Sequence, residues 1–107
     1  MKSIELFYKT GDFAEDKDVA RTIRITEIDS EIKNNNKVQL NFAGVTSATQ
    51  SFIHALISQV IRDNGVKSLD NIQFKNCNSR VKAIVEIVVE YVQDGIFTEP
   101  NDDADVK

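Results

Sequence analysis

The stretch NFAGVTSATQSFIHAL, residues 41 to 56, contains the transition that decides the fold. It follows KVQLNF (37 to 42), in which apolar and polar residues alternate as they do in a half-buried strand. From Phe52 onward the apolar residues recur at helical spacing instead, and Thr49 or Ser47 is placed to cap that helix. The stretch therefore predicts a strand, a polar loop and a helix, in that order.

The sequence on either side repeats this alternation. Residues 3 to 8 (SIELFY) indicate a first strand, and residues 16 to 34 carry apolar residues at helical spacing. The central helix is expected over 49 to 64, a third strand over 71 to 76 and a last helix over 78 to 94. The resulting βαβαβα order predicts an α/β protein with a small, mainly parallel sheet, because each crossover returns the chain to the starting edge.

The composition is that of one globular domain. The chain has 107 residues, of which 41% are hydrophobic and 28% charged. We expect residues 1 to 97 to form this domain. Residues 98 to 107 (TEPNDDADVK) are acidic, polar and interrupted by proline, and are predicted to be a disordered tail.

Charge and residue content exclude several classes of function. A net charge of -4 argues against nucleic acid as a partner, because phosphate binding needs clustered lysine and arginine. No apolar run approaches the roughly 20 residues of a membrane span and the N-terminus lacks a signal-peptide pattern, so a cytoplasmic protein without membrane contact is expected. One histidine and one cysteine supply no set of metal ligands, and neither a metal nor another cofactor is expected.

Hydroxyl and amide residues concentrate where the strands lead into helices. In a parallel sheet these loops emerge at one edge, so residues 10 to 12, 43 to 51 and 76 to 79 should converge beside helix N-termini. Two interpretations stay open, because such residues either cap helices and form turns or recognise a partner or ligand. The candidate binding residues at this edge and on the adjoining helix are Gly44, Thr46, Ser47, Thr49, Gln50, Ser51, Ala55, Ser58, Asn76 and Asn78.

Two helix faces and the cysteine also have two interpretations each. Opposite the apolar stripe of the central helix lies a row of mostly small residues, which indicates a solvated face or a flat docking face: Ser51, Ala55, Ser58 and Arg62. His54 lies at the boundary of that stripe. The last helix has an unusually wide apolar stripe, extended by Ile87, Val89 and Tyr91, which indicates deep burial or a homodimer surface. Cys77 is a filler in a loop or a thiol activated by a helix N-terminus.

VQLNFAGVTSATQSFIHAL (38 to 56) resembles the strand, loop and helix of the STAS superfamily, the sulphate-transporter and anti-sigma-factor-antagonist domains. The usual form there is a Leu-Asp-Leu-Ser-Gly-Val strand followed by an Asp-Ser-Ser-Gly helix start. The chain is more similar to an uncharacterised STAS-like family whose helix begins with a Ser-Phe pair, here Ser51-Phe52. The likeness extends to GDFAEDKDVARTIR and FKNCNSRVKAIVE, and so covers most of residues 10 to 94.

The resemblance also implies a function, with one departure. Aligned on Gly44-Val45, the phosphorylated serine of the superfamily falls on Gln50, which cannot be phosphorylated, and Thr49 or Ser51 is left as a substitute. The resemblance implies a non-catalytic regulatory module that binds a protein partner, such as a kinase-like or regulatory ATPase protein. The alternative is a small-anion or nucleotide sensor that uses backbone amides at the same edge.

Overall fold

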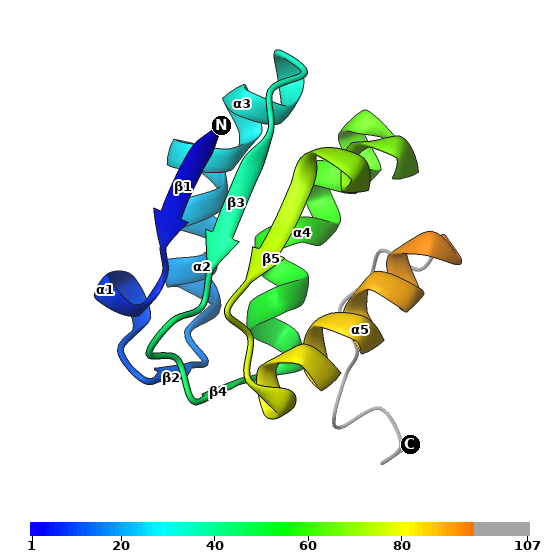
Figure 1. Cartoon of the computed structure of the whole chain (residues 1–107). Coiled ribbons are helices and arrows are strands. Elements are labelled where there is room, and N and C mark those ends of the chain that lie inside the picture. The colour runs from blue at the N-terminus through cyan, green and yellow to red at the C-terminus, as the bar shows by residue number, and fades with distance from the viewer. Residues whose placement is uncertain (96–107) are drawn as a thin grey trace.

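The computed structural model describes residues 1–95 (Figure 1). The predicted tail, residues 98 to 107, and the end of the predicted domain at residue 97 lie outside the described residues. The elements in chain order are β1 (Lys2–Glu5), α1 (Phe7–Thr10), β2 (Phe13–Ala14), α2 (Lys17–Ile23), the π-helical turn η1 (Arg24–Ile28), α3 (Asp29–Lys33), β3 (Val38–Asn41), β4 (Ser47–Ala48), α4 (Gln50–Asn64), the 3₁₀ helix η2 (Val66–Asn71), β5 (Ile72–Lys75) and α5 (Ser79–Gln93).

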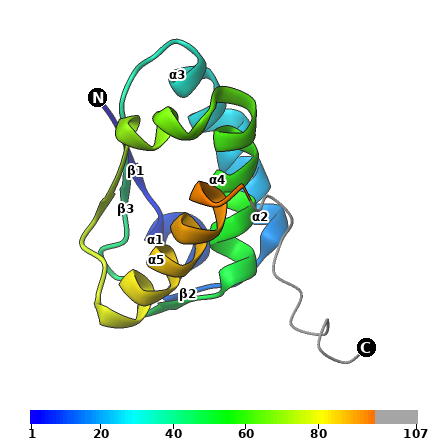
Figure 2. The same cartoon turned by 90° about the vertical axis from the view of Figure 1, so that its right-hand side faces the viewer.

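The main sheet has three parallel strands in the order β1-β3-β5. Ile4 pairs with Leu40 and Leu40 with Phe74, so alternate apolar residues of neighbouring strands share one face. Figure 2 shows α2, α4 and α5 on that side of the sheet, with β1 and β3 on the other side of the view. The α/β fold with a small, mainly parallel sheet is confirmed.

The core lies between this sheet and the helices. Val38, Leu40 and Phe42 are completely buried, as the alternation in residues 37 to 42 predicts. The helix α4 packs against both α2 and α5, so its buried surface is wider than one stripe. Its buried residues are Phe52, Ile53, His54, Leu56, Ile57, Ser58, Val60 and Ile61.

The predicted helix starts and stops are largely confirmed, because they depend on neighbouring residues. Asp16 accepts hydrogen bonds from the backbone N–H groups of Asp18 and Val19, and so caps α2. Thr49 caps α4, which ends at Gly65, a residue with φ of +89°. The expected helix over residues 16 to 34 is present as α2, η1 and α3 in direct succession.

The predicted first strand is too long. It ends at Glu5, and Phe7 and Tyr8 belong to the single helical turn α1. The turn forms because Thr10 N–H donates to the Leu6 carbonyl at 2.9 Å and Gly11 N–H to the Phe7 carbonyl at 2.8 Å. The two aromatic side chains are therefore turned away from the sheet.

A second, two-stranded sheet was not predicted. The strands β2 and β4 pair in parallel, with Phe13 opposite Ser47 and Ala14 opposite Ala48. Strands of two residues contain no readable period, and they form here because their backbones meet across the fold. This small sheet connects the loop after α1 to the loop before α4.

Candidate functional site

The three loops that follow the strands meet at one end of the molecule, as the parallel topology predicts. Thr46 donates to the Asp12 carbonyl twice, from its N–H at 2.7 Å and from its hydroxyl at 3.0 Å. The side-chain amide of Asn78 donates to the Thr46 carbonyl at 2.9 Å. Residues 10 to 12, 43 to 51 and 76 to 79 are thus linked directly, at the end of Figure 1 where α1, β2 and β4 are labelled.

Much of the hydroxyl and amide cluster holds this end together. The Thr49 hydroxyl accepts from Phe52 N–H at 3.1 Å, and the Asn78 side chain accepts from Val81 N–H at 2.8 Å. The side-chain amide of Asn76 donates to the Asn41 carbonyl oxygen at 2.9 Å, which also accepts from Ala43 N–H. The interpretation of these residues as caps and turn formers therefore accounts for Thr46, Thr49, Asn76 and Asn78.

The predicted binding residues differ in exposure. Those exposed at the loop end are Gly44, Thr46, Asn76 and Asn78, and those half-buried are Ser47, Thr49, Gln50, Ser51 and Ala55. Ser58 is only 8% exposed, and Ala55 packs against the core. The expected solvated or docking face along Ser51, Ala55 and Ser58 is therefore wrong, because α2 and α5 enclose α4 from both flanks. His54 is 2% exposed and lies inside the core rather than at its boundary.

Three exposed aromatic residues at the same end were missed. Phe7 is 39% exposed, Tyr8 83% and Phe13 44%, and the rings of Phe7 and Tyr8 meet edge-to-face with centroids 5.7 Å apart. Phe7 lies against Gly44, where a Cβ atom would come within 2.9 Å of the Phe7 ring. We call Phe7, Tyr8, Phe13 and Gly44 the aromatic edge. The available signal was the break in alternation at the Phe-Tyr pair, just before Thr10-Gly11.

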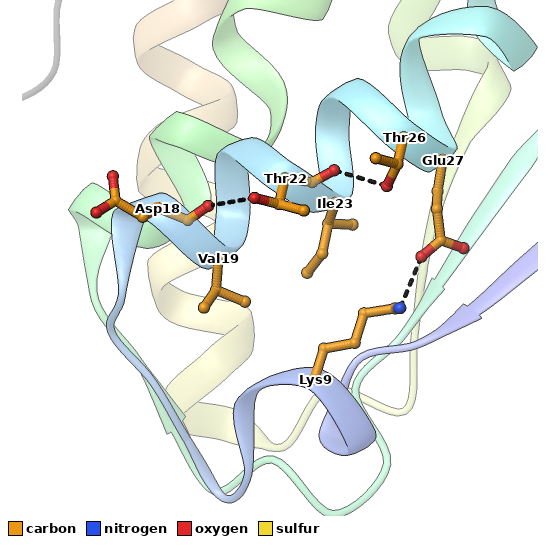
Figure 3. Close-up of a pocket in the computed structure, with 7 residues that line it drawn as sticks. All are labelled: Lys9, Asp18, Val19, Thr22, Ile23, Thr26 and Glu27. Carbon is orange, nitrogen blue, oxygen red and sulfur yellow. Dashed lines mark hydrogen bonds and ion pairs between the residues drawn. The ribbon is translucent and has the colours of Figure 1, made fainter.

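A cavity of about 300 Å³ lies between α1 and the α2–η1 segment (Figure 3). Lys9 Nζ forms an ion pair with Glu27 Oε2 at 2.8 Å across one side of it. The hydroxyls of Thr22 and Thr26 donate to carbonyls of their own helix, those of Asp18 and Thr22. With these polar groups paired, Val19 and Ile23 supply its apolar lining, a lining that can receive a small apolar group.

Cys77 shows no sign of an activated thiol. The residue is half-buried, and burial raises the pKa of its thiol above the usual value, while the nearby charge of Lys82 acts in the opposite direction. Within residues 1–95, no group of three or more His, Cys, Asp or Glu side chains could hold a metal ion. Also within this range, no helix has the length and apolarity to cross a membrane.

The family model of the STAS-like domain of unknown function (DUF4325) matches residues 18–82, more than half of the chain. The chain therefore belongs to this STAS-like family. The matched segment runs from the start of α2 into the start of α5 and contains β3, α4 and β5. No curated protein and no solved structure matched the chain.

Proposed function

We propose that this chain is a non-catalytic, cytoplasmic regulatory module that binds a protein partner through the aromatic edge. The observation that supports the proposal is the exposure of Phe7, Tyr8 and Phe13 beside the joined loops. Tyrosine and phenylalanine are enriched in protein interfaces, and tyrosine in particular at the residues that contribute most to binding. Gly44 and Thr46 are exposed beside these rings and would contribute to the polar rim of the interface.

The start of α4 gives this module a different relation to phosphorylation from that of the anti-sigma-factor antagonists it resembles. Gln50 is the first residue of α4, at the position where the resemblance puts the phosphorylated serine. An amide there can neither accept a phosphoryl group nor add charge at the helix N-terminus. Partner binding would therefore depend on the surface itself and on the state of the partner, for which a kinase-like or regulatory ATPase protein is our proposal.

The test is co-purification with the tagged full chain from its native organism. The variant Tyr8→Ala with Phe13→Ala removes two exposed rings, and we expect it to lose the partner recovered with the unmodified chain. Val66→Ala is the matched control, because Val66 is also an exposed apolar residue, 44% exposed, but follows the C-terminal end of α4. Equal recovery with the double variant, shown to be folded by circular dichroism, contradicts the proposal.

A second measurement addresses the small-anion or nucleotide sensor. A ligand that binds the folded state raises the melting temperature by mass action. We expect ATP, GTP and inorganic phosphate to leave the melting temperature of the full chain unchanged. A concentration-dependent rise would favour the sensor.

The homodimer through the last helix also stays a prediction. Ile87, Val89 and Tyr91 are half-buried in the single chain, so part of each side chain is accessible. Light scattering coupled to size-exclusion chromatography gives the mass in solution. A mass that falls from dimer to monomer in Tyr91→Lys would support that surface.

A further inference from the structure

A groove follows the outer edge of the main sheet, between β5 and α5. One part has a volume of about 570 Å³, and its apolar lining comes from Leu69, Ile72, Phe74, Val85 and Val89. A second part of about 350 Å³ shares Phe74 and Val85 with the first and continues to Asn76 and Cys77. The groove therefore accompanies β5 along its whole length.

The backbone of β5 has an open side next to this groove. Phe42 N–H donates to the Lys75 carbonyl at 2.8 Å, so Lys75 directs its backbone groups towards β3. Because successive residues of a strand face opposite edges, the N–H and C=O of Phe74 point away from β3. The order β1-β3-β5 makes β5 an edge strand, and an open strand edge is a template for another strand.

The wall of the groove formed by α5 is acidic. Glu86 and Glu90 line it one helical turn apart, and both are exposed. Within residues 1–95 neither glutamate forms an ion pair. An occupant with positive charge is favoured there, since opposite charges across an interface attract and like charges are penalised.

This charge distinguishes among the occupants that an open edge can take. The chain's own residues 96 to 107 carry Glu99, Asp102, Asp103 and Asp105 against a single lysine, so they are repelled. A second copy would bring its own Glu86 and Glu90 to the same place. A basic segment of another protein has neither disadvantage.

We propose that β5 and the groove receive an extended segment of a partner protein, added as a strand along β5. The residues of that segment that face the groove alternate with those that face away. We infer an apolar residue against Phe74, Val85 and Val89, with lysine or arginine two residues before and after it, whose stems reach Glu86 and Glu90. This surface is separate from the aromatic edge, so the inference does not depend on the function proposed above.

The first test is fluorescence anisotropy with the full chain and two labelled peptides, Thr-Lys-Thr-Val-Thr-Lys-Thr and Thr-Glu-Thr-Val-Thr-Glu-Thr. We expect saturable binding of the lysine peptide and binding at least about tenfold weaker for the glutamate peptide. Absence of saturable binding of the lysine peptide up to about 1 mM overturns the proposal.

Two charge-matched variants separate the groove from the overall charge. Glu90→Lys should weaken the lysine peptide about tenfold, whereas Glu15→Lys, on the loop before α2, should change the affinity by less than about twofold because separated surface charges are screened. An equal loss in both variants means non-specific attraction and overturns the proposal.

Strand addition has its own signature. Two lysine peptides, N-methylated on the two alternating sets of amides, present different edges without hydrogen-bond donors. Only one of them should lose affinity, and the unmethylated peptide should slow hydrogen exchange at Phe74 N–H in ¹⁵N spectra. Equal binding by both methylated peptides, or spectral changes confined to residues 7 to 13, overturns the proposal.

Discussion

The side chain of Asn78 joins the start of α5 to the backbone of Thr46. Its oxygen accepts from Val81 N–H at 2.8 Å, and its nitrogen donates to the Thr46 carbonyl at 2.9 Å. One side chain thus caps a helix and fastens the loop that precedes α4. These two roles can be separated, because an aspartate keeps the acceptor and loses the donor.

We expect Asn78→Ala to lower the free energy of unfolding by about 1 to 2 kcal/mol, because both hydrogen bonds are lost. Asn78→Asp should cost about 0.5 to 1 kcal/mol, since the cap is kept and only the bond to Thr46 is lost. Urea denaturation measures both changes. Ser79→Ala, at the exposed neighbouring position, is the control and should stay within about 0.5 kcal/mol. An Asn78→Asp variant as stable as the unmodified chain would show that the bond to Thr46 contributes nothing.

The contact between Gly44 and Phe7 predicts a difference between two glycine substitutions. Gly44 has φ of +90° and Gly65 φ of +89°, but only at Gly44 would a Cβ atom meet a side chain, the Phe7 ring at 2.9 Å. Gly65→Ala should cost about 1 to 3 kcal/mol from backbone strain alone. Gly44→Ala should cost about 1 kcal/mol more, because the ring must also move.

A double-mutant cycle assigns that extra cost. In a Phe7→Ala background, Gly44→Ala should cost about as much as Gly65→Ala, because the ring is gone. If the difference between the two glycine substitutions persists without the ring, the contact with Phe7 is not its cause.

Cys77 should react slowly with thiol reagents. Its raised pKa leaves less thiolate at a given pH than an ordinary cysteine has, and its partial burial limits access. We expect iodoacetamide to modify the folded chain at pH 8 more slowly than it modifies glutathione, and the rate to rise once the chain is unfolded in urea. A folded chain that reacts faster than glutathione would contradict the assignment of Cys77 as a structural residue.

Asp29 predicts a pH effect on stability. Desolvation raises the pKa of its carboxyl group, the nearby Arg24 lowers it, and Asp63 raises it, with a net rise. The folded state therefore binds this proton more tightly than the unfolded state, and the associated stability is present at low pH and is lost as the pH rises through the folded pKa.

Asp29→Asn removes this dependence. Its free energy of unfolding relative to the unmodified chain should become more favourable between pH 3 and pH 6, by a small amount because the carboxylate is partly exposed. Urea denaturation across this range gives the difference. A difference that stays constant, or that falls with pH, would show that the pKa of Asp29 is not raised.

Features set by neighbouring residues could be predicted from the sequence. The strands around Leu40 and Phe74 follow from alternation, and the starts of the helices at Asp16, Thr49 and Asn78 follow from residues that satisfy free backbone N–H groups. The meeting of the three loops also follows, because parallel strands carry their C-terminal ends to one edge. The STAS-like class was visible for the same reason, since the motif from Val38 to Leu56 is continuous in the chain.

The functional surface could be predicted less well, because exposure depends on segments far away in the sequence. Ser58 is spaced like a surface residue of α4, but α2 and α5 cover the flanks of that helix and bury it. Phe7 and Tyr8 continue an alternating run, yet hydrogen bonds within α1 turn them out of the sheet. The groove beside β5 likewise exists only because α5 brings Glu86 near an open strand edge. The sequence by itself determined the elements and their order through local backbone preferences, whereas only the tertiary structure decided which faces stay open, because that depends on how the elements cover one another.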